Sequence, residues 1–463
     1  MNSMNQAENS DVGFNRRDFL KGGSLAAFMA MMGGVPLIAQ PAASTDTSMK
    51  FDLPKVKVGL IGLGPWGREI LDQLGRLQQA DIAAICDNYP AMLRRSASKA
   101  PGAAQVEDYK AILDNNEIKA VIVATASYQH KDIALAALKA GKHVYCEAPL
   151  ATSVEDTKAI AVAAKNSIGQ VFQAGLQMRS SPQRHFLLPF IRSGALGKPV
   201  MARGQWHKKQ SWRAASPNAE REKAVNWRLN QATSPGLIGE IGIHSLDQTG
   251  WYFNAEPVAV SGFGSTMLWK DGRDVPDTVQ VVVEYPGGLR LSYDATLASS
   301  FDGEYELLSG SEATVMMRFE NLGKEVAWMF KEVDSALLGW EVYARKDNFY
   351  KETGIVLAAG SSKQTALVDK PTGDAPAALP PLYYALEAFL ANCSEVGTAV
   401  EDFKTMFDAN DKAALSTSLQ SLKLKSFAGY QDGYAATVLA LKANEAVNGN
   451  KRIELKKEWF ELA

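Results

Sequence analysis

The strongest constraint on the fold is a glycine-rich segment between a short apolar run and a helical stretch. Residues 55–61 (KVKVGLI) read as a buried strand, and residues 68–77 are predicted to be helical. A GxGxxG pattern in this context is typical of a dinucleotide site: the first glycine allows a tight turn, the second lets backbone approach a pyrophosphate, and the third allows close helix packing. The predicted cofactor loop is Gly62, Leu63, Gly64, Pro65, Trp66 and Gly67.

A second predicted strand, residues 82–86, ends at an acidic residue twenty positions after Gly67. Asp87 suits the two ribose hydroxyls of NAD and would repel the 2′-phosphate of NADP. Asn88 follows it rather than a cation, which favours NAD, although Arg94 and Arg95 keep NADP open. The alternative for Asp87 is a turn or helix-capping residue.

Strands and helices continue to alternate after Asp87. Residues 120–124, 142–146 and 170–174 read as strands, and a helix is predicted at 129–140. This alternation predicts a parallel, doubly wound sheet, which binds ligands at the carboxyl ends of its strands. The further residues predicted to bind cofactor at this edge are Thr125, Ser127, His130, Glu147 and Gln177.

The C-terminal half has a different pattern. Its predicted strands follow one another with short turns, such as Pro286-Gly287-Gly288, at residues 258–267, 278–285, 289–295, 304–309 and 313–319. A loop rich in Pro, Gly, Ala and Asp is expected at 365–381, before helices at 382–395 and 431–446. The second half therefore forms a separate α/β domain.

The first 45 residues have the layout of an export signal. Arg16 and Arg17 precede an almost uncharged stretch at residues 22–39, which matches the twin-arginine type. The alternative is a single membrane anchor, because about 18 apolar residues approach the shortest membrane span. We expect a signal at 1–45, a dinucleotide-binding domain at 52–177 that can recover a C-terminal helix, and a substrate and oligomerisation domain at 178–463. The mature protein is then periplasmic or in the cell envelope.

Composition removes several classes of protein. Lys and Arg number 49 against 51 Asp and Glu, and the net charge of −2 argues against a nucleic-acid binder or a polybasic membrane surface. Three cysteines form neither a disulfide framework nor a zinc motif, and we expect no metal site. An enzyme or a binder of small ligands remains.

Four segments resemble the Gfo/Idh/MocA oxidoreductases: residues 62–67, TASYQH at 125–130, GKHVYCEAPL at 141–150 and GEIGIH at 239–244. The resemblance implies an N-terminal Rossmann domain with a parallel sheet and a C-terminal α/β domain with an open, mostly antiparallel sheet. It implies a homodimer or homotetramer and a cis peptide bond before Pro149. The export signal makes the chain similar to the glucose–fructose oxidoreductase-like members.

One position departs from the family pattern. Typical reductase members have Glu-Lys-Pro at the strand end, and the lysine commonly belongs to the catalytic machinery. Here Ala148 occupies that place between Glu147 and Pro149. Alanine neither donates a proton nor polarises a hydroxyl, so acid–base chemistry must come from other residues.

The second motif offers those residues. Glu240, His244 and Asp247 are spaced by four and three, so they share one face if residues 236–252 are helical. The resemblance implies that His244 takes a hydroxyl proton while the carboxylate at Glu240 orients it. The alternative is a surface pair without chemistry. Tyr128 could replace the missing lysine as a proton donor or pack against nicotinamide.

Aromatic and polar side chains suggest a carbohydrate substrate, because sugar rings stack on aromatic faces and need directional hydrogen bonds. The first hypothesis is an NAD(P)-dependent oxidoreductase of a sugar or glycoside. The second is a redox-neutral, NAD-dependent glycosidase or lyase acting through a transient 3-keto sugar, and the third is a non-catalytic nucleotide or sugar sensor. The residues predicted to bind substrate are Arg179, Trp206, His207, Trp227 and Asp247.

Overall fold

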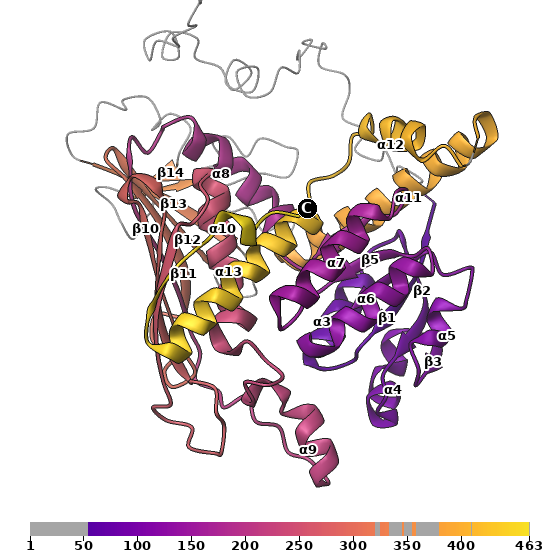
Figure 1. The fold of residues 1–463 in the computed structure, drawn as a ribbon, viewed down its shortest axis with the longest axis horizontal. Helices are drawn as coiled ribbons and strands as arrows, with labels where there is room; N and C mark the ends of the chain where they lie inside the picture. Colours follow the sequence, from indigo (N-terminus) through magenta and orange to yellow (C-terminus); the bar gives the residue numbers. More distant parts are fainter. Residues whose placement is uncertain are drawn as a thin grey trace, which may run out of the picture.

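The computed structural model describes residues 54–319, 325–332, 345–346, 354–357, 379–408 and 410–462. The expected signal at 1–45 and nearly all of the expected loop at 365–381 lie outside these residues. The described chain forms two sheets with helices around them (Figure 1).

The N-terminal sheet has six described strands, all parallel, in the order β3-β2-β1-β4-β5-β6. This order and the flanking helices confirm the predicted Rossmann domain. The central strands are buried along their whole length because helices cover both faces. The strands are β1 (Val56–Ile61), β2 (Ala80–Cys86), β3 (Ala104–Val106), β4 (Ala120–Val123), β5 (His143–Cys146) and β6 (Phe172–Ala174).

A helix from near the end of the chain packs on this first sheet. In α11 (Pro381–Met406), Phe389 is fully buried, and its ring lies 5.7 Å from that of Tyr145 in β5. The Gln173 side chain of β6 also donates a hydrogen bond of 2.8 Å to the Ala385 carbonyl. The other helices of this half are α3 (Pro65–Leu74), α4 (Pro90–Ser96), α5 (Lys110–Leu113), α6 (His130–Lys139) and α7 (Val154–Asn166).

The C-terminal sheet has ten described strands in the order β14-β15-β13-β12-β11-β7-β10-β9-β8-β16. Its pairs are antiparallel except for β7 and β10, which confirms the expected open, mostly antiparallel sheet. The strands are β7 (Pro199–His207), β8 (Ala259–Ser265), β9 (Thr278–Glu284), β10 (Arg290–Thr296), β11 (Glu304–Gly310), β12 (Ala313–Phe319), β13 (Glu325–Lys331), β14 (Arg345–Lys346), β15 (Gly354–Leu357) and β16 (Arg452–Glu454).

Strand β7 lies in the middle of this sheet, where the sequence predicts none. Its segment PVMARGQWH lacks a clear apolar alternation because Gly204 stands at an inward position. A Cβ atom added to Gly204 would lie 3.1 Å from Ser245, so the missing side chain lets α10 (Ile243–Phe253) pack close to the strand. Tertiary packing thus places a strand that local propensity does not indicate.

Helices α8 (Pro182–Arg192), α10 and α13 (Tyr430–Gly449) lie between the large sheet and the Rossmann half (Figure 1). Helix α12 (Lys412–Gln420) follows α11, and the short helix α9 (Ala219–Val225) projects away from the large sheet. Among the described residues, no helix has both the length and the apolar character needed to span a bilayer.

Candidate active site

The glycine loop joins β1 to α3 with very little room. Gly62 has a φ of +98°, a backbone conformation that side chains strongly disfavour. A Cβ atom on Gly67 would lie 1.9 Å from the Gly62 carbonyl oxygen, whereas a Cβ atom on Gly64 would meet nothing within 4 Å. The first and third glycines are therefore needed for the fold, and the second faces open space where a phosphate group fits.

Asp87 lies at the end of β2 and is bound to this loop. Its carboxylate accepts hydrogen bonds of 2.9 Å from the backbone N–H groups of Leu63 and Tyr89. A carboxylate has about four acceptor sites, so two ribose hydroxyls can still bind. Asp87 thus stabilises the turn, which is the alternative role considered from the sequence, and it still has acceptor sites for ribose hydroxyls. Asn88 is exposed beside it.

Three polar atoms at the carboxyl ends of the parallel strands are buried without a hydrogen-bond partner among the described residues. They are Thr125 Oγ1 after β4, Glu147 Oε1 after β5 and Gln177 Oε1 after β6. Native proteins rarely leave buried polar atoms unpaired, and such atoms commonly mark a ligand site. Together with the open side of Gly64, they fit a bound dinucleotide whose polar groups would pair with them.

Glu147 is the most strongly perturbed carboxyl group at this edge. Burial raises its pKa to about 7, against the opposing effect of the Trp66 indole and the Ala148 backbone N–H. The peptide bond between Ala148 and Pro149 is cis, which confirms the expectation from the resemblance.

His130 braces the backbone around the site. Its Nδ1 lies 3.0 Å from the Pro149 carbonyl oxygen, and its Nε2 lies 3.2 Å from that of Thr125. Burial lowers the pKa of the ring to about 4, so the neutral imidazole donates to one carbonyl at a time. Both ring nitrogens therefore face protein backbone, and His130 holds the loops that carry other predicted cofactor contacts.

Glu240 comes from the C-terminal half and meets the Rossmann half at its strand ends. It accepts hydrogen bonds from Ser127 Oγ at 3.0 Å and Ser234 Oγ at 3.2 Å, and Arg228 Nε lies 3.3 Å from its second oxygen. Burial raises the pKa of this carboxyl, and the Arg228 cation and the two hydroxyls oppose that rise. The site therefore holds one buried carboxyl with three donors around it.

The predicted pairing of Glu240 with His244 is wrong. Residues 238–242 form a π-helical turn before α10, and within the described residues the Glu240 carboxylate is bound by Ser127, Ser234 and Arg228 and forms no hydrogen bond with His244. His244 Nδ1 is buried, and no residue that the structure describes forms a hydrogen bond with it. Burial lowers the pKa of His244 to about 4, so the imidazole is neutral and can accept a proton.

The electrostatic neighbours of His244 come from the large sheet and α8. The Glu306 carboxylate raises its pKa and the Arg184 guanidinium lowers it. Arg184 is almost completely buried, forms ion pairs with Glu306 and Glu325, and donates a hydrogen bond of 2.6 Å to Gln248. Sequence analysis does not find this cluster, because its members lie far apart in the chain and carry no motif.

Arg179 and Asp247, both predicted to bind substrate, bind each other. Arg179 Nε and Nη2 donate to the two Asp247 oxygens at 2.9 and 2.7 Å, and Nη1 donates to Asp432 at 2.8 Å. The guanidinium also lies 5.3 Å from the ring centre of Trp251. These contacts join the 3₁₀ turn at residues 177–180 to helices α10 and α13. The ion pair of Arg179 with Asp247 therefore stabilises the packing of these elements, and its donors are already used within the protein.

The two other predicted substrate residues of β7 lie on opposite faces of the sheet. Trp206 shares the face of Gly204, which packs on α10, and is half-buried. His207 points to the other face, where its Nε2 lies 2.5 Å from Asp294 and its Nδ1 lies 3.1 Å from the Phe301 carbonyl. His207 therefore lies on the face opposite Trp206, contrary to the prediction that both bind the substrate.

Tyr128 and Trp227 come together across the two halves. Tyr128 is 40% exposed, and its ring meets that of Trp227 edge to face with centres 6.5 Å apart. The Arg228 guanidinium lies 4.4 Å from the Trp227 ring centre. This exposed group of two rings and one cation stands next to Glu240. Arg228 follows the predicted substrate residue Trp227 in the sequence, but nothing in the spacing predicts its contact with Glu240.

Within the described ranges, no group of three or more His, Cys, Asp or Glu side chains is arranged to hold a metal ion.

Two named relatives are dehydrogenases of polyhydroxylated substrates. The chain is 29% identical over 229 residues to inositol 2-dehydrogenase of Acidothermus cellulolyticus, covering 49% of this chain and 62% of that one. It is 26% identical over 275 residues to levoglucosan dehydrogenase of Pseudarthrobacter phenanthrenivorans, covering 54% and 68%. The chain thus spans less than two thirds of the first of these relatives.

Solved structures share the fold over almost their whole length. A levoglucosan dehydrogenase in complex with NADH and L-sorbose superposes with a TM-score of 0.65 at 20% identity, covering 87% of this chain and 99% of that one. An aldose-aldose oxidoreductase from Caulobacter crescentus, complexed with glycerol, gives a TM-score of 0.60 at 19% identity, covering 87% and 100%.

Two family models match the two halves in turn. The model described as an oxidoreductase family with an NAD-binding Rossmann fold matches residues 56–175. The model of the Gfo/Idh/MocA C-terminal domain matches residues 189–321. Since these models together span more than half of the sequence and agree with the described sheets, the chain belongs to the Gfo/Idh/MocA family of oxidoreductases, with an NAD-binding Rossmann domain.

Proposed function

We propose that the protein is an NAD(H)-dependent oxidoreductase of a sugar or glycoside. The observation that carries this proposal is the hydrogen bond from Ser127 to Glu240. It brings a buried carboxyl group of the C-terminal half to the strand ends where the glycine loop and the unpaired Thr125, Glu147 and Gln177 atoms lie. A nicotinamide dinucleotide bound at these strand ends would supply hydride transfer to or from a substrate carbon.

His244 is the proposed proton acceptor for the substrate hydroxyl. Its pKa of about 4 keeps the ring neutral near pH 7, and its Nδ1 has no partner within the described protein. Glu240 and Arg228 together provide a carboxyl group and a cation close to the same strand ends, so they can orient hydroxyl groups of the substrate. Arg228 stays charged and therefore does not transfer a proton.

Aromatic rings provide the surface for the sugar. Tyr128 and Trp227 stand at the junction of the two halves, and Trp206 is half-buried on the face of β7 that packs on α10. Proteins bind a sugar by stacking its apolar ring face on an aromatic side chain and by forming hydrogen bonds with its hydroxyl groups. The named relatives act on inositol and levoglucosan, which supports a polyhydroxylated substrate for this chain.

The second candidate is a redox-neutral glycosidase or lyase that uses a transient 3-keto sugar. Ala148 favours it, because alanine leaves room at the strand end where the family pattern has a lysine. Transient oxidation at C3 acidifies the C2 hydrogen; the aglycone then leaves by elimination, water adds, and the hydride returns. The net redox change is zero.

The experiment that separates these functions mixes purified protein and NAD⁺ with a panel of sugars and glycosides, following NADH absorbance and aglycone release together. NADH formed in proportion to oxidised sugar supports the dehydrogenase, and aglycone release without net NADH supports the redox-neutral enzyme. Nucleotide binding without turnover on any substrate contradicts both and leaves the sensor. Omission of NAD⁺ from protein stripped of nucleotide is the control.

The proposal includes export of the folded protein by the twin-arginine route into the periplasm or cell envelope. The Arg16-Arg17 pair ahead of an apolar stretch supports this. Changing both arginines to lysine should leave the protein in the cytoplasm, as measured by fractionation. Release of the double variant at the wild-type level would contradict this route.

The proposal also includes a homo-oligomer formed through the outer face of the large sheet. Met201 in β7 and Phe263 in β8 point away from the helices and are 42% and 59% exposed. Exposed apolar side chains on one sheet face support an interface between copies. The mass in solution, measured by light scattering for the wild type and for Phe263→Ser, tests this: a monomeric wild type would contradict it.

A further inference from the structure

Helix α9 carries a cation from the C-terminal half onto the Rossmann half. The guanidinium carbon of Arg221 lies 3.9 Å from the ring centre of Tyr89, a short cation–π contact between residues 132 positions apart. Tyr89 follows Asp87 by two residues, and its backbone N–H donates to the Asp87 carboxylate. Arg221 therefore stands at the end of the cofactor site that is suited to the adenosine ribose.

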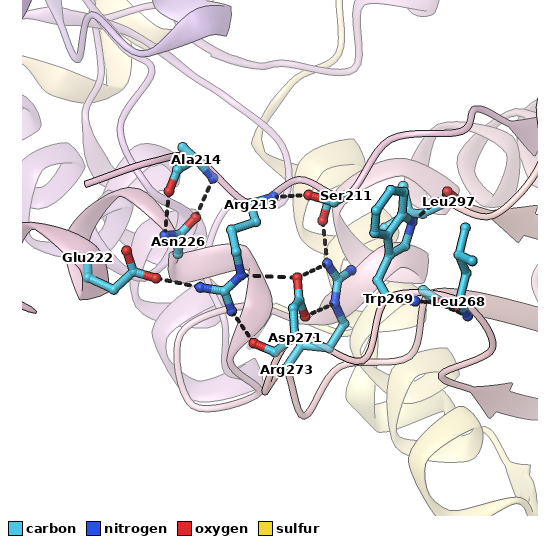
Figure 2. A network of polar contacts seen from close by, with 11 residues as sticks. Ser211, Arg213, Ala214, Glu222, Asn226, Leu268, Trp269, Asp271, Arg273 and Leu297 are labelled. Atoms are coloured by element: carbon cyan, nitrogen blue, oxygen red, sulfur yellow. Dashed lines mark hydrogen bonds and ion pairs between the residues drawn. The ribbon is translucent and has the colours of Figure 1, made fainter. Parts of the chain in front are cut away.

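A polar network fixes the position of α9 (Figure 2). Arg213 forms an ion pair with Glu222 of α9, and its Nε donates to Asp271 at 3.0 Å. Arg273, whose side chain has no exposed surface, donates to both Asp271 oxygens, from Nη2 to Oδ2 at 2.7 Å and from Nε to Oδ1 at 2.8 Å. Because Glu222 follows Arg221 in the helix, this network fixes the part of the helix backbone from which Arg221 reaches the Tyr89 ring.

The base of the helix is held as well. The Asn226 side chain accepts a hydrogen bond of 2.7 Å from the Ala214 backbone N–H and donates one of 2.9 Å to the Ala214 carbonyl. Figure 2 shows this pair beside the Arg213 and Glu222 contacts. The helix is thus bound on two sides, so the Arg221 contact is a fixed element of the site rather than the resting place of a free side chain.

Arg221 has one donor that the protein does not use. Its Nε is buried and has no hydrogen-bond partner in the part of the chain that the structure describes. A buried guanidinium N–H without an acceptor is costly unless a ligand supplies one. The ribose oxygens of a nucleotide held by Asp87 are acceptors of the right kind, and so is a 2′-phosphate.

We propose that Arg221 completes the adenosine-ribose site from the C-terminal half and sets the balance between NAD(H) and NADP(H). This inference rests on the proposed use of a nicotinamide dinucleotide. Asp87 disfavours a 2′-phosphate by charge repulsion, while Arg221 attracts it and also donates to an unphosphorylated ribose. The two side chains therefore have opposite effects on NADP(H) and the same effect on NAD(H).

The test measures dissociation constants by fluorescence titration for three probes: NADH, NADPH and reduced nicotinamide mononucleotide, which lacks adenosine. Arg221→Ala should raise the dissociation constant of NADPH about tenfold or more, which is the loss expected for a hydrogen bond to a charged group. The dissociation constant of NADH should rise by less. The mononucleotide should bind as before. Lys223→Ala is the matched control, because it removes the same charge from an exposed position of the same helix.

A double-mutant cycle sharpens the result. Asp87→Asn should improve NADPH binding in the wild-type background and improve it less in Arg221→Ala, because the attracting cation is gone. Equal affinities of the wild type and Arg221→Ala for both dinucleotides would overturn the inference while leaving the proposed function intact. Failure of the wild type to bind NADH at all would instead contradict the proposed function.

Discussion

Ser127 of the Rossmann half donates a hydrogen bond of 3.0 Å to Glu240 of the C-terminal half. Both side chains are buried, at 2% and 7% exposure. The contact joins residues 113 positions apart at the strand ends where the cofactor site lies. It therefore couples the association of the two halves to the protonation of the Glu240 carboxyl, whose pKa is raised by burial.

Removal of the Ser127 hydroxyl tests this coupling without a substrate. Ser127→Ala should lower the free energy of unfolding by about 1–3 kcal/mol, because a buried carboxylate loses one of its donors. In a Glu240→Gln background the same change should cost less, since the amide carries no charge. Urea unfolding of the four proteins gives the interaction energy. If Ser127→Ala lowers the free energy of unfolding equally in the wild-type and Glu240→Gln backgrounds, the hydrogen bond between Ser127 and Glu240 is not the cause of that loss.

Two glycines of the loop should have different roles, Gly64 in binding the cofactor and Gly67 in the stability of the fold. Gly64 has φ −59° and ψ −177°, which alanine also adopts, and an added Cβ meets no protein atom. Gly64→Ala should keep the unfolding midpoint and weaken NADH about tenfold or more by overpacking against the nucleotide. NADH titration and thermal unfolding measure the two effects. An unchanged affinity for NADH would contradict the prediction that a phosphate group of the cofactor binds at Gly64.

Gly67→Ala is the matched contrast. A Cβ there would lie 1.9 Å from the Gly62 carbonyl oxygen, so helix α3 has to move away from β1. We expect a loss of about 1–3 kcal/mol in the free energy of unfolding. Stability equal to wild type would show that the helix and strand are not packed as closely as the structure has them.

The sequence predicts the Rossmann half well because its signals are local. The glycine spacing and the acidic end of the second strand depend on neighbours within about 30 residues. By contrast, the Glu240 carboxylate binds Ser127 and Ser234 instead of pairing with His244, and a spacing of four residues does not show which of these partners it takes. Contacts such as Arg228 with Glu240 and Arg221 with Tyr89 depend on how the two halves meet, which no motif encodes.

His143 in β5 should make stability depend on pH below about 6.5. Its Nδ1 accepts a hydrogen bond of 2.8 Å from the Val171 N–H, and burial lowers its pKa to about 4. The unfolded chain takes up a proton near pH 6.5 while the folded ring stays neutral, so the contribution of His143 is present above that pH and is lost as pH falls toward 4.

His143→Gln removes this titration. The stability difference between wild type and variant should shrink by about 1–3 kcal/mol from pH 7 to pH 4.5, measured by urea unfolding. Val144→Ala on the same strand is the control: it removes buried apolar surface and no titratable group, so its effect should not change over this range. A constant difference for His143→Gln would contradict the assignment.

His244 as the proton acceptor predicts a loss of turnover without a loss of cofactor. His244→Ala should keep the NADH dissociation constant and lower kcat about 100- to 10,000-fold, the usual contribution of a positioned acid–base group. Ala148→Lys adds a second arm: a plain dehydrogenase should tolerate the lysine, whereas a site arranged for elimination and hydration should lose activity by crowding. Full turnover in His244→Ala would remove the histidine from the mechanism.

Arg228 should act on the reaction through the Glu240 carboxyl. Its Nε lies 3.3 Å from Glu240 Oε2, and its charge lowers the pKa of that group against the effect of burial. Removing the cation therefore raises the pKa further, so in Arg228→Ala the acidic limb of the kcat/KM profile should move to higher pH if ionised Glu240 is required. Arg228→Lys, which retains a charge but not the planar fork, should move it less. A loss of kcat/KM of equal size at every pH, with no movement of the acidic limb, would mean that Arg228 serves only to bind the sugar beside Trp227. In that case KM should rise while kcat stays near the wild-type value.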